Sequence, residues 1–278
     1  MINCKQGNNL FEFVLKQRQE GKTIGFVPTM GALHQGHLAL IQAAKDECDL
    51  VVCSIFVNPT QFNNPSDLEN YPRNLQDDAE LLESVDCDIL YTPSVADVYP
   101  EGQDKFEAPD VGNMLSVLEG EHRPGHFQGV MQVVSLLLDQ VNPTHLYMGL
   151  KDFQQFAICS KMVELQGRPV AMRGIPIVRE KNGLAMSSRN TRLSAEGKEE
   201  AAIIHEALKL TKENLALKDI EELKTQAIQQ ISTLKGSRLE YFEIVHQKTL
   251  RSSDDKSQLI ALCAVWIEGV RLIDNMIL

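Results

Sequence analysis

The sequence lacks the features that mark several common classes of protein. No apolar run reaches the length of a membrane-spanning helix, and residues 1–6 lack the apolar segment of a signal peptide. Positive charge is in deficit, because 27 Lys and Arg stand against 38 Asp and Glu, a formal net charge of -11. Binding nucleic acid requires clustered Lys and Arg, so we expect neither a nucleic-acid partner nor a membrane partner.

The cysteines also lack a pattern that would point to disulfides or a redox motif. The chain has six of them and no Cys-x-x-Cys pair, and most lie among apolar residues. Buried reduced thiols are therefore expected, and with them a cytoplasmic location. The composition, with 43% hydrophobic and 23% charged residues, is ordinary for a soluble enzyme. The length of 278 residues is sufficient for one or two domains.

Apolar strands alternate with helical patterns over the first 175 residues. The expected strands cover 23–28, 50–56, 88–91 and 144–148, and the expected helices cover 9–20, 37–48, 74–85, 126–141 and 152–166. Such alternation predicts βαβ units and a parallel sheet with helices on both faces. We therefore expect an α/β fold with a Rossmann-like domain over residues 1–175, which binds nucleotide and substrate.

Beyond residue 175 the elements are grouped rather than alternating. Helices are expected around 194–216 and 219–234, followed by two β-rich runs at 238–246 and 258–267. This order predicts a second, smaller α+β domain over residues 176–278.

The stretch from Pro28 to His37 lies between an expected strand and an expected helix. Its glycines allow close approach of a ligand, and His34 and His37 are three residues apart, on one helical face. Amides at a helix start attract phosphate, so the stretch predicts a nucleotide-phosphate site. It is not a P-loop, because His37-Leu38 replaces Lys-Ser/Thr, and the histidine spacing is not that of a zincin. The alternative is a pair of solvated or capping histidines.

Two further loops follow expected strands and converge on the same sheet edge. Asn58 and Gln61 lie just past the second strand, where Asn58-Pro is ordinary turn chemistry but the Gln61 amide suits both carboxylates and hydroxyls. After the strand at 144–148, Lys151 is suited to hold phosphate, and Asp152 either accepts from ribose hydroxyls or caps a helix.

Residues 180–190 place two serines and Arg189 in a glycine-bearing loop at the expected domain junction. Such a loop is suited to close on a triphosphate, with a surface turn as the alternative. His126, in Arg123-Pro-Gly-His-Phe127, reads as a capping or solvated residue, and we assign it no catalytic role.

Taken together, five segments resemble the pantoate–β-alanine ligase (pantothenate synthetase) family of the nucleotidyltransferase superfamily. In chain order they are Pro-Thr-Met-Gly-Ala-Leu-His-Gln-Gly-His, Ser-Ile-Phe-Val-Asn-Pro-Thr-Gln-Phe, Arg-Pro-Gly-His-Phe, Gly-Leu-Lys-Asp-Phe-Gln-Gln and Gly-Leu-Ala-Met-Ser-Ser-Arg-Asn. They spread from residue 28 to residue 190. One motif alone would indicate only the superfamily, whereas five in order are specific. The Met-Ser-Ser-Arg segment departs from the wider superfamily, which carries lysines there.

The resemblance implies a carboxy-terminal lid domain, a homodimer and a site around ATP. The implied ATP-binding residues are Met30, Gly31, Ala32, Leu33, His34, Gln35, Gly36, His37, Gly149, Leu150, Lys151, Asp152, Val178, Met186, Ser187, Ser188 and Arg189. It implies that Gln61 and Gln155 bind pantoate, that Gln61 also binds β-alanine, and that His37 is the proton donor. The catalytic residues that we expect are His34, His37, Lys151 and Arg189, because their side chains are suited to stabilise the negative charge on the phosphate groups.

The implied reaction uses ATP and Mg²⁺ to make pantoyl adenylate and pyrophosphate, after which β-alanine attacks to give pantothenate and AMP. The sequence leaves open the metal ligands, the group that accepts the β-alanine proton, the dimer contacts, the extent of lid closure and any regulation. Two other functions stay possible at this stage: an adenylyltransferase that forms a stable dinucleotide, and a noncatalytic nucleotide-binding protein.

Overall fold

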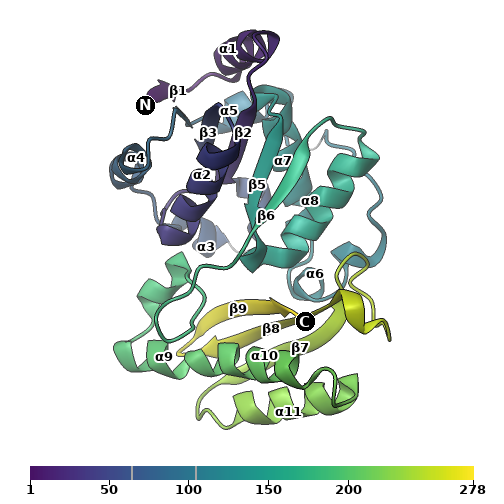
Figure 1. Ribbon diagram of the computed structural model, residues 1–278. Helices are drawn as coiled ribbons and strands as arrows, with labels where there is room; N and C mark the ends of the chain where they lie inside the picture. Colours follow the sequence, from purple (N-terminus) through teal and green to yellow (C-terminus); the bar gives the residue numbers. More distant parts are fainter. Residues whose placement is uncertain (64, 104) are drawn as a thin grey trace. The chain divides into compact units, whose positions relative to one another are not determined.

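A computed structural model describes residues 1–63, 65–103 and 105–278 (Figure 1). The described chain forms two compact units, one of residues 1–150 with 158–176 and one of residues 151–157 with 177–278. The second unit thus includes residues 151–157, which the sequence analysis assigns to the first domain. The lid role of the carboxy-terminal region stays a prediction. Among the described residues, every helix is too short or too polar to cross a membrane.

The first unit contains a parallel sheet in the strand order β1-β4-β3-β2-β5-β6. The predicted α/β class with a Rossmann-like sheet is confirmed. The strands are β1 Ile2–Cys4, β2 Ile24–Thr29, β3 Leu50–Ile55, β4 Ile89–Tyr91, β5 His145–Gly149 and β6 Ala171–Ile175. The edge strands β1 and β6 were not predicted, because each is short and neither reads as an apolar run.

Helices connect these strands and cover both faces of the sheet. They are α1 Gly7–Gln19, α2 Gln35–Glu47, α3 Pro65–Glu69, α4 Leu75–Ser84, α5 Val95–Val98, α6 Glu119–His122, α7 His126–Val141 and α8 Phe153–Leu165. Right-handed crossovers put α2 and α4 on one face and α1, α7 and α8 on the other. In agreement, α1 contacts α7, and Ser135 of α7 bonds Gln166 just after α8.

The direction of the crossovers reverses between β2 and β5. From β2 the chain moves outward through β3 to β4, whereas from β5 it moves the other way to β6. Open α/β sheets bind ligands at the carboxyl ends of the strands at such a switch point. The segments that follow β2 and β5 are therefore the ones the topology favours for a ligand.

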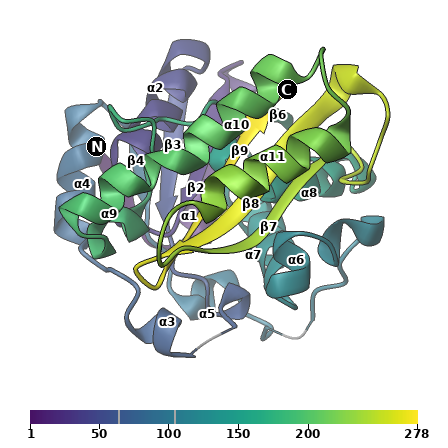
Figure 2. The same ribbon diagram turned by 90° about the horizontal axis from the view of Figure 1, so that it is seen from below.

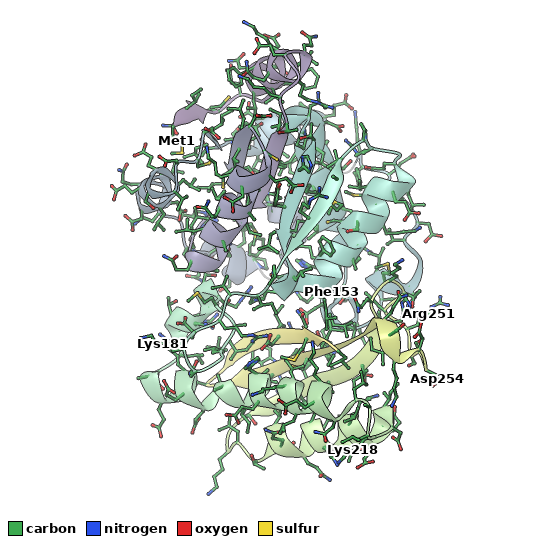
Figure 3. All side chains as sticks on the ribbon, viewed as in Figure 1. Met1, Phe153, Lys181, Lys218, Arg251 and Asp254 are labelled. Carbon is green, nitrogen blue, oxygen red and sulfur yellow. The ribbon has the colours of Figure 1, made fainter. Side chains whose placement is uncertain are left out.

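The second unit is a small antiparallel sheet with helices packed on one face. Its strands are β7 Arg238–His246, β8 Leu259–Ile267 and β9 Val270–Ile277, and its helices are α9 Ala195–Glu200, α10 Ala202–Asn214 and α11 Ile220–Ser232. Figure 2 shows α10 and α11 along one face of this sheet, and the apolar side chains between them form a buried core. Figure 3 places Arg251 and Asp254 in the β7–β8 connection.

Two details of this unit differ from the sequence expectation. The helix expected over 194–216 is divided at Ala201, where Ile204 N–H bonds the Ala201 carbonyl, a tighter step of three residues. Strand β9 was not predicted, because Arg271, Asp274 and Asn275 interrupt its apolar pattern.

A charged cluster in the first unit ties the end of α2 to β5 and β6. The Glu47 carboxylate accepts hydrogen bonds from Arg173 Nε at 2.9 Å and from the Tyr147 hydroxyl at 2.7 Å. These bonds lower the pKa of Glu47 from an ordinary 4.5 to about 2, and the bond from Arg173 has the largest effect. A carboxyl whose pKa is lowered by folding stabilises the fold above pH 4.5 and loses that contribution as the pH falls toward 2.

Replacing Glu47 with Gln should therefore lower stability at neutral pH and matter less in acid. We expect a loss of about 1 kcal/mol at pH 7, a small value because solvent screens a carboxylate that is partly exposed. Urea unfolding followed by circular dichroism between about pH 7 and pH 3 measures the difference between variant and parent. The difference should shrink below about pH 4.5. A stability difference between variant and parent that is constant over the whole pH range would contradict the lowered pKa of Glu47.

Candidate functional site

The loop between β2 and α2 has an unusual backbone. Gly31 has φ = +80° and Ala32 has φ = +51°, so two consecutive residues lie in the left-handed region. Gly31 suits that region, but an alanine there is strained and persists only where its surroundings hold it. The bonds that hold this loop come from the end of β2 and from α4.

Asp78, in the first turn of α4, supplies the main restraint. Its carboxylate accepts the Ala32 N–H at 3.0 Å and the Leu33 N–H at 2.7 Å, and its exposed fraction is 3%. A Cβ on Gly31 would lie 2.9 Å from the same carboxylate, so the loop needs a glycine there for space as well as for φ. The Gly31 N–H is also engaged, since it donates to the Thr29 hydroxyl at 3.2 Å.

These bonds change the chemistry expected of the loop. The sequence predicts that amides at the start of the helix receive phosphate, but the loop amides of Gly31, Ala32 and Leu33 and the helix-start amide of Gly36 already donate within the protein. The physical reason is that a buried carboxylate must be compensated by donors, and the loop amides are the nearest ones. Donors for an anion must therefore come chiefly from side chains.

His34 and His37 form a reciprocal cap at the start of α2. His34 Nδ1 accepts the Gly36 N–H at 3.1 Å, and His37 Nδ1 accepts the His34 N–H at 3.3 Å. The ring centroids are 4.1 Å apart and tilted by 43°. Since Nδ1 is the acceptor in both rings, each neutral ring carries its proton on Nε2. The capping alternative is therefore what the structure shows, with the proton of each neutral ring on Nε2, and the donor function of the pair stays a prediction.

This tautomer assignment is testable by nitrogen NMR. Long-range ¹H–¹⁵N spectra at about pH 8, where an ordinary imidazole is neutral, should give the Nε2–H pattern for His34 and His37. His126, whose Nδ1 lies 2.8 Å from a carbonyl, should instead give the Nδ1–H pattern. Single His→Gln variants assign the signals. An Nδ1–H pattern for His34 or His37 would contradict the reciprocal cap.

Gln61 lies in a short 3-10 turn after β3, Pro59–Gln61, with its amide held in one orientation. Asn58 Nδ2 donates to Gln61 Oε1 at 3.1 Å, and Asn58 Oδ1 in turn accepts from the Tyr99 hydroxyl at 2.6 Å. The oxygen of Gln61 is therefore an acceptor within the network, and its NH₂ group faces Met30 Sδ at 3.1 Å. The structure thus brings Gln61 together with the loop that carries the two histidines.

His126 supports the same turn from the start of α7. It is 5% exposed, and its Nδ1 donates to the Gln61 backbone carbonyl at 2.8 Å. Gly129, one turn along α7, allows close packing, because a Cβ there would lie 2.5 Å from the Thr60 carbonyl oxygen. The interpretation of His126 as a capping or solvated residue is wrong, because the ring is buried, lies after the N-cap Gly125 and bonds a distant turn. Asn58, which reads as simple turn chemistry, also has a network role that local sequence does not signal.

In the second unit, Lys151 and Asp152 lie in a 3-10 turn, Leu150–Asp152, directly after β5 ends at Gly149. The Lys151 ammonium is 4.0 Å from the Asp152 carboxylate, and its side chain is 18% exposed. Gln155 follows in the first turn of α8. The structure places this lysine at the strand end that the sequence analysis assigns to it.

The loop that carries Met186 to Arg189 folds as a small hairpin in the same unit. Met186 N–H bonds the Val178 carbonyl at 2.9 Å, and Arg179 pairs with Ala185 in an isolated bridge. Ser187 then caps the 3-10 turn Ser188–Arg192 by accepting the Arg189 N–H at 3.3 Å. The hairpin brings Val178 beside the Met-Ser-Ser-Arg segment, although the two are several residues apart in sequence.

Comparisons with known proteins agree along the whole chain. A profile of the family described as pantoate-beta-alanine ligase matches residues 3–277. The chain is 45% identical to pantothenate synthetase of Porphyromonas gingivalis over 96% of each chain, and 47% identical to that of Lysinibacillus sphaericus over 94% of this chain and 92% of the other.

Solved structures give the same result. The crystal structure of pantothenate synthetase from Thermus thermophilus superposes with a TM-score of 0.92 at 38% identity, covering 99% of both chains. The pantoate-beta-alanine ligase of Francisella tularensis, complexed with beta-gamma ATP and beta-alanine, superposes with a TM-score of 0.81 at 36% identity, covering 100% of this chain and 97% of the other.

Proposed function

This chain belongs to the pantoate–β-alanine ligase family, and on that premise we propose how its residues divide the work of the reaction. The reaction is ATP-dependent ligation of pantoate and β-alanine to pantothenate. It runs through pantoyl adenylate and releases AMP and pyrophosphate. The first step forms a bond between a pantoate carboxylate oxygen and the α-phosphorus of ATP, and the bond to pyrophosphate breaks. The second step joins the β-alanine nitrogen to the acyl carbon, and AMP leaves.

Adenylation needs donors for the charge on the phosphate oxygens rather than a base, because the pantoate carboxylate is already ionised near neutral pH. We assign this role to His34 and His37, whose Nε2–H groups are fixed by the reciprocal cap, together with Lys151 and Arg189. The main support for this assignment is that the two histidines, each held in one tautomer, follow β2 directly. This is the switch point of the sheet, where open α/β sheets bind ligands. The remaining ATP contacts are assigned to residues 30–37, 149–152, Val178 and 186–189.

Gln61 and Gln155 are assigned to pantoate, and Gln61 also to β-alanine. The Gln61 amide is suited to a carboxylate or hydroxyl oxygen because Asn58 occupies its oxygen and leaves the NH₂ group as the donor. The turn that carries it is held from both sides, by Asn58 on one side and by His126 on the other. A rigid donor of this kind orients the pantoate carboxylate toward the α-phosphorus.

Magnesium is proposed to arrive on the triphosphate rather than in a protein cage. Within residues 1–63, 65–103 and 105–278, no group of three or more His, Cys, Asp or Glu side chains is gathered to hold a metal. The buried acid nearest the histidine loop, Asp78, already accepts two backbone amides. We therefore propose that phosphate oxygens and water supply most of the Mg²⁺ ligands, and we route no step through a protein-bound ion.

A homodimer and a cytoplasmic location complete the proposal. The dimer rests on the family resemblance. The location rests on the cysteines, all six of which are free thiols, five of them buried. Such thiols suit a reducing compartment.

The assignment of His37 is tested with pyrophosphate exchange, which measures adenylation alone. Wild-type protein should exchange labelled pyrophosphate into ATP only when pantoate is present. His37→Ala should lower the exchange rate by roughly 10²–10³, the usual effect of removing one donor to a developing charge. His37→Gln, which keeps an N–H donor of similar reach, should retain part of the rate.

His246→Ala is a matched control, because His246 Nδ1 also accepts a local backbone N–H, that of Lys248 at 3.1 Å. It should leave exchange unchanged. Exchange in His37→Ala equal to that of the wild type would refute the role of His37. ATP binding without any exchange would indicate a noncatalytic protein, and a stable dinucleotide in place of AMP would indicate an adenylyltransferase.

A further inference from the structure

Strand β9 carries two adjacent polar residues in a buried position. Asp274 and Asn275 are each 5% exposed, although their neighbours along the strand are mostly apolar. Buried polar groups are costly unless they are hydrogen-bonded, and both residues are bonded to segments far from them in sequence. Those segments are the ones to which ATP contacts are assigned in this unit.

Asp274 holds the hairpin of residues 178–186. Its carboxylate forms a two-pronged pair with Arg179, with Nη1 at 2.6 Å and Nη2 at 2.9 Å. Arg179 Nη1 also donates to the Gly183 carbonyl at 3.0 Å, across the hairpin. A bidentate guanidinium–carboxylate pair fixes direction as well as distance, so Asp274 sets where the hairpin leaves Val178 and returns at Met186.

Asn275 holds the other segment. Its Nδ2 donates to the Lys151 carbonyl at 2.9 Å, its own N–H donates to Asp274 Oδ1 at 2.8 Å, and its carbonyl accepts from Arg179 Nη2 at 3.3 Å. One dipeptide therefore bonds both to the backbone of Lys151 and to the base of the loop that carries Arg189.

We propose that Asp274 and Asn275 are positioning residues for the adenylation step. Together with Arg179 they form the β9 brace, defined as these three residues. The proposal rests on the assignment of Lys151 and Arg189 to ATP. Two cations that stabilise one phosphorus centre must keep their relative positions, because a displacement of about 1 Å costs up to roughly 10²-fold in rate. The brace supplies that constraint within this unit through its bonds to the Lys151 carbonyl and to Arg179.

A purely structural brace would stabilise the fold and affect both chemical steps alike. A positioning brace affects adenylation selectively, because amide formation from pantoyl adenylate no longer requires the triphosphate donors to be aligned. The two half-reactions are therefore measured separately. One is pantoate-dependent pyrophosphate exchange. The other is pantothenate formation from supplied pantoyl adenylate and β-alanine.

The variants are Asp274→Asn, which weakens the ion pair at nearly constant shape, and Asn275→Ala, which removes the donor to Lys151 but keeps the ion pair. Each should lower exchange at least ~10-fold and leave the second half-reaction within about 2-fold of wild type. Arg179→Lys should resemble Asp274→Asn, because an ammonium cannot replace a bidentate guanidinium. Asn214→Ala, which removes an amide-to-carbonyl bond of 2.8 Å on α10, is the control and should change neither.

Equal losses in both half-reactions, or no loss in either, would overturn the proposal. If Asp274→Asn does not fold, Asn275→Ala decides the question, since it leaves the Arg179 pair intact. Failure of the underlying assignment is distinguishable, because Lys151→Ala and Arg189→Ala would then exchange pyrophosphate at the wild-type rate. Loss of exchange in those two variants together with unaffected brace variants would reject the brace alone.

Discussion

The carboxylate of Asp78, bonded to the amides of Ala32 and Leu33, is the interaction on which the site depends. Each bond from a backbone amide to a charged acceptor contributes about 1.5–3 kcal/mol, whereas a non-glycine residue in the left-handed region costs about 1–3 kcal/mol. Two such bonds outweigh the strain at Ala32. The loop therefore turns sharply after β2 and delivers His34 to the N-cap of α2, where the histidine pair can lock its tautomers.

This arrangement separates the site from a glycine-rich loop that binds phosphate through its amides. Here the amides at the turn are used internally, and the donors that we propose are imidazole N–H groups, whose rings are held by the amides of Gly36 and His34. Neutral imidazole donors suit an acidic protein of net charge -11, because they stabilise charge that develops on phosphate without a dense patch of cations. The permanent charges that we assign to ATP, Lys151 and Arg189, lie in segments that β9 bonds through the Lys151 carbonyl and through Arg179.

The sequence predicted the parallel sheet and the loops at its strand ends because those signals are local. Apolar β-prone runs bounded by glycine and proline mark β2 and β3, and the histidine spacing marks one helical face. It did not predict what holds the loops. Asp78 reads as an ordinary acid in a helical first turn, and its partner Ala32 lies 46 residues away. Asp274 reads as a charge that breaks a strand, so the sequence does not indicate β9, and its partner Arg179 lies 95 residues away.

The most direct test of the account is a crystal structure of the chain with a nonhydrolysable ATP analogue and pantoate. The account predicts phosphate oxygens within about 3.2 Å of Nε2 of both His34 and His37, with Asp78 still bonded to the loop amides. Phosphates seated on the amides of Ala32 and Leu33 with Asp78 displaced, or bound away from the histidines, would contradict it.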